Sequence, residues 1–229
     1  MALFSIIQSG LLAISAYLGS PEGLPLNRYC VIRTSTEITK VYDHNKKESL
    51  KFREKILLMK DESASDSVIL HVENLDEREG IRWTRLYYSS KDFATFLQEG
   101  TPARASRALV KKGGVVSEVP PDRVQKGANF LEEVFPLLST QTSPGKETVR
   151  LIRKNWPSFR YRINHTSVTP LSGKTLLVQK YVGNLWMSSR APFGLLKGDM
   201  EVTISFEGKT GTYQKQKTHF ELMEVGEEK

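Results

Sequence analysis

The sequence is poor in the residues that build covalent frameworks and common metal sites. Cys30 is the only cysteine among 229 residues, so the chain has no internal disulfide and no cysteine-rich zinc site. The four histidines lie far apart and form no HxxxH or HExxH pair. No GxSxG elbow occurs, and Ser172-Gly173-Lys174-Thr175 lacks the first glycine of a phosphate-binding loop. We therefore predict no catalytic residue, no metal, no cofactor and no enzymatic activity.

Acidic residues are scarce relative to basic ones. The chain has 33 Lys and Arg against 26 Asp and Glu, which gives a net charge of +7. Residues 146–217 carry 13 basic and 4 acidic side chains, whereas residues 61–100 are acidic overall. This asymmetry predicts a positively charged face and a polyanionic partner, either nucleic acid or an acidic membrane surface. The alternative is a surface whose uneven charge is merely solvated.

Two segments are the candidates for contact with a polyanion. Arginine binds phosphate in bidentate fashion, and exposed aromatic rings stack on bases or insert at a lipid interface. The basic candidates are Arg104, Arg107, Lys111, Lys112, Arg150, Arg153, Lys154, Arg160 and Arg162. The aromatic candidates are Trp156, Phe159 and Tyr161, although in a strand the rings could equally belong to the core.

The first 21 residues contain no charged side chain. This pattern favours an apolar helix over residues 1–20 that is packed or touches a membrane. A signal peptide and a membrane span are the alternatives, since Ala13-Ile14-Ser15 has the form of a cleavage site but no basic residue precedes it.

The remainder, residues 21–229, is predicted to be a single α+β domain. Strands are expected from Tyr29 to Ile38, around Val68-Ile69-Leu70 and around Trp83 to Tyr88. Helices are expected to start at Ser89-Ser90-Lys91-Asp92 and to run over residues 129–138. Alternation from Met200 to Phe206, a turn, and a return strand from Thr212 predict an antiparallel sheet in the C-terminal half with packed helices. Prolines and glycines among basic residues predict a mobile basic loop near residues 101–127.

The segment from Arg190 through Ala191-Pro192-Phe193-Gly194 to Ile204 resembles a stretch of rhabdovirus matrix proteins. In that family an Arg-rich Pro-Phe turn leads through Gly-Leu and Lys-Gly into an alternating strand. The resemblance implies a basic structural protein that self-associates and binds both nucleoprotein and the inner membrane face. This chain departs from the family in having Ala191 where an arginine is expected, and in lacking PPxY and P(T/S)AP motifs.

Together these observations predict a non-enzymatic, matrix-like viral adaptor. Its expected partners are nucleoprotein or RNA, an anionic membrane surface and further copies of itself. Its expected location is the virion and the host cytoplasm or nucleus, peripheral to membrane. The alternative function is a viral protein that binds single-stranded nucleic acid, such as a movement protein or silencing suppressor, with the three aromatic candidates stacking on bases.

Overall fold

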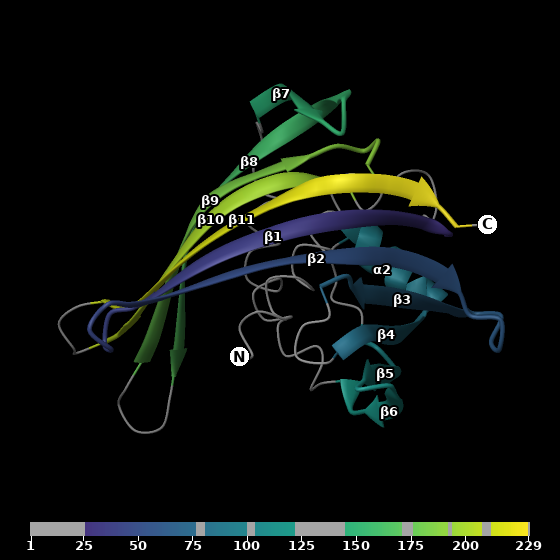
Figure 1. Cartoon of the computed structure of the whole chain (residues 1–229). Coiled ribbons are helices and arrows are strands. Elements are labelled where there is room, and N and C mark those ends of the chain that lie inside the picture. The colour runs from purple at the N-terminus through teal and green to yellow at the C-terminus, as the bar shows by residue number, and fades with distance from the viewer. Residues whose placement is uncertain are drawn as a thin grey trace.

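The computed structural model describes residues 26–76, 81–99, 104–121, 145–170, 176–191, 194–207 and 212–228. Within these ranges, eleven strands and one helix are defined (Figure 1). In chain order they are β1 (Arg28–Lys40), β2 (Lys46–Lys60), β3 (Ser67–Asn74), β4 (Ile81–Ser89), α2 (Ser90–Glu99), β5 (Arg107–Lys112), β6 (Val115–Val119), β7 (Gly145–Leu151), β8 (Lys154–Pro170), β9 (Leu176–Met187), β10 (Leu195–Phe206) and β11 (Thr212–Glu227).

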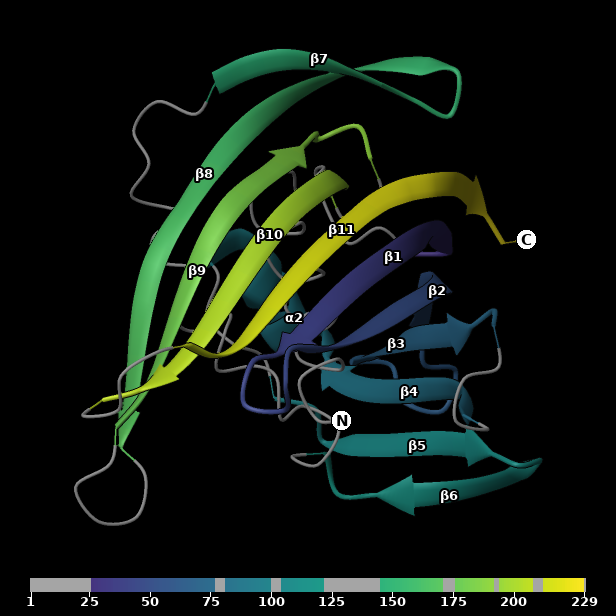
Figure 2. The ribbon, with the colours of Figure 1, turned by 60° about the vertical axis from the view of Figure 1, so that its left-hand side comes forward.

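All of these strands belong to one antiparallel sheet. Their order is β6-β5-β4-β3-β2-β1-β11-β10-β9-β8-β7, so β1 pairs with β11 at the centre, and β6 and β7 form the two ends. Figures 1 and 2 show the sheet bent into a deep arch, with α2 on its hollow side.

The two faces of the sheet differ because successive side chains of a strand point in opposite directions. In β10, Met200 and Val202 are buried, whereas Glu201 between them is only half-buried. Pairing carries this pattern across the sheet, since Met200 lies opposite Thr218 of β11, and Thr218 lies opposite Thr36 of β1. We call the face that bears Met200, Val202 and Thr218, on the side of α2, the inner face, and the other the outer face.

Helix α2 covers one part of the inner face. It begins after Ser89, whose hydroxyl oxygen accepts a 3.3 Å hydrogen bond from the backbone N–H of Asp92, as an N-cap does. Phe93 is buried and packs on Tyr88, with ring centroids 5.1 Å apart. The helix start that the sequence predicts at Ser89-Ser90-Lys91-Asp92 is therefore confirmed, and α2 packs mainly against β3 and β4.

The predicted α+β class is wrong. The sheet is not confined to the C-terminal half, since β1 to β6 supply half of it, and the described residues contain a single helix of 10 residues. Strand β2 shows why the sheet of the N-terminal half was not predicted from the sequence. Most residues in the first half of β2 are charged. Phe52 is buried although Lys51 and Arg53 flank it, so this short alternation was hidden among the charged side chains.

Part of the predicted mobile loop near residues 101–127 is a β-hairpin. Residues 107–119 form β5 and β6, joined by Gly113 and Gly114, with φ of 55° and 84°. Two residues of positive φ make the turn that matches the twist of paired strands, so these glycines belong to a hairpin and not to a linker. The predicted helices over residues 1–20 and 129–138 lie outside the described residues, and the single domain over residues 21–229 stays a prediction.

Candidate functional site

The inner face carries a largely apolar surface over the central strands. Its side chains come from five neighbouring strands, and each exposes less than a tenth of its area. They are Cys30 and Ile32 of β1, Phe220 and Leu222 of β11, Leu196, Met200 and Val202 of β10, Tyr181 and Leu185 of β9, and Tyr161 and Ile163 of β8.

Phe220 is the largest fully buried side chain of this surface. Its ring lies over Gly198 of the neighbouring strand, where a Cβ atom would collide with the ring and with Leu185. The absence of a side chain at Gly198 therefore makes room for the phenyl ring at the centre of the arch.

Four buried, uncharged polar side chains of β1 and β11 interrupt the apolar surface: Thr34, which lies opposite Phe220, and a group of three. Thr36, Gln216 and Thr218 expose 1%, 1% and 3% of their area. The hydroxyl oxygens of Thr36 and Thr218 are 3.1 Å apart, and the amide nitrogen of Gln216 donates to Thr218 Oγ1 across 3.2 Å. We call these three residues the buried polar row.

One polar atom of this row lacks a partner. Among the described residues, no hydrogen bond reaches Gln216 Oε1, and its strand neighbours at this position are Ile38 and Val202. A buried polar atom left unpaired destabilises the fold. The position is therefore chemically unusual within a surface largely suited to apolar packing.

Cys30 lies on the inner face near the beginning of the central strand β1 and is 1% exposed. Burial raises the pKa of its thiol well above the ordinary value. Because the thiolate is the reactive form, this thiol is not suited to nucleophilic chemistry.

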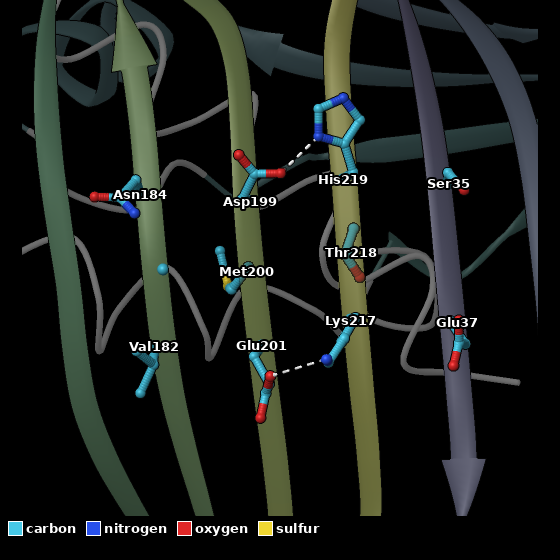
Figure 3. A pocket seen from close by; sticks show the side chains of 11 residues that line it. Ser35, Glu37, Val182, Asn184, Asp199, Met200, Glu201, Lys217, Thr218 and His219 are labelled. Carbon is cyan, nitrogen blue, oxygen red and sulfur yellow. Dashed lines mark hydrogen bonds and ion pairs between the residues drawn. The ribbon is translucent and has the colours of Figure 1, made fainter.

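The outer face carries cross-strand pairs of charged side chains. Asp199 Oδ1 lies 2.6 Å from His219 Nδ1, and Glu201 Oε2 lies 3.7 Å from Lys217 Nζ (Figure 3). Together with Glu37 and other residues of β1 and β9, they line a shallow depression of about 480 Å³.

This depression is a weaker candidate than the inner face. Its acidic groups already lie against lysine or imidazole partners on the neighbouring strand, and exposed pairs of this kind contribute little energy. Among the described residues, no group of three or more His, Cys, Asp or Glu side chains is arranged to hold a metal ion.

The predicted basic residues are not brought together. Residues 104–112 lead into and form β5, beside one end of the sheet, whereas residues 150–162 lie in β7 and β8 at the opposite end (Figure 2). Arg107 is paired with Glu118 at 3.0 Å, and Arg160 with Glu147 at 2.9 Å. Most of the other predicted basic residues are exposed, with Arg153 in the two-residue turn between β7 and β8.

Two of the three predicted aromatic contacts are buried in the protein. Trp156 and Tyr161 each expose 6% of their area, and the indole N–H of Trp156 donates to the carbonyl oxygen of Leu151 at 3.0 Å. Phe159 is 40% exposed. Stacking on bases or insertion into lipid by Trp156 and Tyr161 is therefore excluded in this fold, and the core interpretation holds for them.

The buried polar row was missed because polar residues are normally assigned to a solvated face. The signal was present in β11, where Lys215, Lys217 and His219 alternate with Gln216 and Thr218. All the charged residues of this stretch share one face, which leaves its uncharged polar residues on the other.

No protein-family model matches the chain, and no curated protein matches it. Among solved structures, a DUF1329 family protein from Desulfovibrio piger is similar at 7% identity and a TM-score of 0.31, over 97% of this chain and 93% of that one. A LolA superfamily protein from Nitrosomonas europaea is similar at 8% identity and a TM-score of 0.27, with the same coverage of 97% and 93%. Likenesses this distant do not indicate what the chain binds.

The predicted relationship to rhabdovirus matrix proteins is wrong, since the segment that carried the resemblance belongs to an eleven-stranded antiparallel sheet and not to the α+β domain that the family implies. The matrix-like adaptor function is wrong with it, as are the partners (nucleoprotein or RNA, an anionic membrane surface, further copies of the chain) and the location in a virion or the host cytoplasm or nucleus. The alternative of a viral protein that binds single-stranded nucleic acid is also wrong, because two of its three stacking rings are buried.

In the part of the chain that the structure describes, no helix has the length and hydropathy needed to cross a membrane.

Proposed function

We propose that this protein binds an amphiphilic molecule with a long apolar chain on the inner face of its sheet, and that it acts as a binding protein without catalysing a reaction. The observation that carries the proposal is the largely apolar surface that extends over five strands from β8 to β1 and is interrupted by buried, uncharged polar side chains.

The chemistry of the inner face suits such a ligand. Small-molecule sites are lined mainly by apolar and aromatic side chains, with a few polar groups that fix orientation. Here Tyr161, Tyr181 and Phe220 supply aromatic area, and the buried polar row supplies the polar groups. Each methylene group removed from water contributes about 0.8 kcal/mol, so a long acyl chain provides ample binding energy.

The distribution of charge supports the same assignment. The outer face carries the Asp199–His219 and Glu201–Lys217 pairs, whereas the residues that cover the inner face of β10 are uncharged. An ionised group on the inner face would lose its hydration without a compensating partner. The site therefore favours the apolar part of a ligand.

Photocrosslinking tests the location of the site. A long-chain fatty acid bearing a diazirine is bound to the full chain and irradiated, and the labelled residues are mapped by mass spectrometry. We expect saturable labelling of inner-face residues such as Tyr181, Met200 and Phe220, reduced by excess unlabelled fatty acid. Labelling that is confined to the outer face, or that does not saturate, would contradict the proposal.

A matched pair of variants tests the same point without crosslinking. Met200→Lys places a charge on the inner face, and Glu201→Lys places the same side chain on the outer face one residue away. We expect Met200→Lys to abolish fatty-acid binding and Glu201→Lys to retain it, with circular dichroism as the check on folding. Recovery of the bound fatty acid chemically unchanged after prolonged incubation tests the absence of catalysis.

A further inference from the structure

We infer that the buried polar row recognises a hydroxyl group carried by the apolar chain of the ligand, so that the preferred ligand is a hydroxylated acyl chain and not a plain one. This inference rests on the function proposed above and names the ligand class of the same site. It starts from Gln216, which is 1% exposed and whose Oε1 atom has no partner among the described residues.

The position of Gln216 places this atom within the apolar surface. Its partners in the neighbouring strands are Ile38 on one side and Val202 on the other, and both are buried. An apolar chain lying across β10, β11 and β1 therefore passes over the amide of Gln216. A polar group on that chain would meet the amide, with the hydroxyls of Thr218 and Thr36 beside it.

The chemistry of the row selects a neutral group that both donates and accepts. The amide nitrogen of Gln216 donates to Thr218, and the hydroxyls of Thr218 and Thr36 are themselves within hydrogen-bond distance. With the amide in this orientation a ligand must donate to Oε1, and with the amide turned over it must accept from the nitrogen. A hydroxyl group satisfies both cases, whereas a carboxylate satisfies only the second.

The lack of charged side chains in the buried polar row also favours a neutral ligand group. The three residues of the row are uncharged, and the ion pair beside them on this face, Lys40 with Glu48 at 2.6 Å, is already closed: Glu48 lies opposite Ile38, and Lys40 lies opposite Gln214. An ionised ligand group at Gln216 would therefore be desolvated without a counter-charge. The row is suited to a hydroxyl in the middle of a chain and not to an ionised head group.

The experiment compares stearate with a panel of stearates that carry one hydroxyl group at different carbons. Affinities are measured by displacement of a fluorescent fatty acid from the wild-type chain and from Gln216→Leu. The matched control is Gln214→Leu, which makes the same change on the same strand and face, two residues from the row. Thr36→Val is a second variant, for use if Gln216→Leu does not fold.

We expect the wild-type chain to bind at least one hydroxystearate about tenfold more tightly than stearate, which corresponds to one well-made hydrogen bond. Gln216→Leu should remove this preference without weakening stearate, and Gln214→Leu should keep it. Equal binding of all stearates by the wild-type chain, or a preference that survives in Gln216→Leu, would overturn the inference and leave the proposed function intact. Failure of every stearate to bind would instead overturn the proposed function.

Discussion

Thr36 and Thr218 hold their hydroxyl oxygens 3.1 Å apart on the two central strands, inside a surface that is largely apolar. Each is almost fully buried. The pair lies where β1 meets β11, so the contact joins the two halves of the sheet by a polar interaction as well as by backbone pairing.

This pair should be energetically coupled. We predict that Thr36→Val and Thr218→Val each lower the free energy of unfolding by about 1 kcal/mol, because each leaves a buried hydroxyl or amide with one partner fewer. The double variant should lose less than the sum of the two, since the valines then leave no threonine hydroxyl unpaired. Urea denaturation of the four proteins measures the coupling, and strict additivity would show that the hydroxyls do not interact.

Gly198 should not tolerate a side chain. A Cβ atom at this position collides with the ring of Phe220, so we predict that Gly198→Ala lowers the free energy of unfolding by about 1–3 kcal/mol. Phe220→Leu in the same chain should restore part of the loss because it removes the colliding atoms. Thermal denaturation of the single and double variants tests both statements, and a double variant less stable than both single variants would refute the packing argument.

The thiol of Cys30 should be unreactive in the folded protein. An ordinary thiol is half ionised near pH 9.0, but burial raises the pKa of Cys30 far above this value. Ellman's reagent at pH 8 should therefore label the native chain slowly and the urea-unfolded chain fully, with one thiol per chain. Equally fast labelling in both states would show that the inner face opens readily to solvent.

His71 should make stability depend on pH in a narrow window. Burial, followed by the positive charge of Arg85, lowers the pKa of His71 from its usual 6.5, and Arg85 Nε donates to His71 Nδ1 at 3.2 Å. The unfolded chain therefore binds the proton more readily, and this contribution is fully present above pH 6.5. It is lost as the pH falls from 6.5 toward the lowered pKa.

Titration by NMR and denaturation at several pH values measure this effect. The ring protons of His71 should titrate with a midpoint below 6.5. His71→Gln, which keeps an acceptor for Arg85, should flatten the loss of stability below pH 6.5. A midpoint at or above 6.5 would contradict the geometry described for this pair.

Local patterns in the sequence were reliable where one face is apolar and the other is not. The alternation in Met200 to Phe206 and the return strand from Thr212 appear as β10 and β11, and Ser89 caps α2 as its sequence context indicates. Both signals come from neighbouring residues. They therefore do not depend on how distant segments meet.

The site and the overall class depend on pairing between distant segments, which a single sequence does not display. Trp156 and Tyr161 occur among arginines, and only the register of β8 with its neighbours shows them to be buried. Gln216 gains its significance from Ile38, which lies 178 positions earlier in the chain and opposite it in the sheet. Composition and net charge carry no information of this kind.

The pairing of β1 with β11 also constrains the order in which the strands of the sheet can pair during folding. These strands lie far apart in the chain but occupy the centre of the sheet, so the first half, β1 to β6, forms by local hairpins while one edge of β1 has no partner. During synthesis that edge stays unpaired until β11 has been made, and closing so long a loop is slow.

Every row of the inner face that crosses from β11 to β1 is assembled in this last step. The threonine pair and the flanks of Gln216 therefore come into existence only when the final strand docks. A nascent chain arrested before β11 would contain the strands β1 to β6 and β7 to β10, but β1 and β10 would have no strand between them. The proposed ligand surface would therefore be incomplete. The proposed ligand surface therefore exists only once β11 has paired with β1.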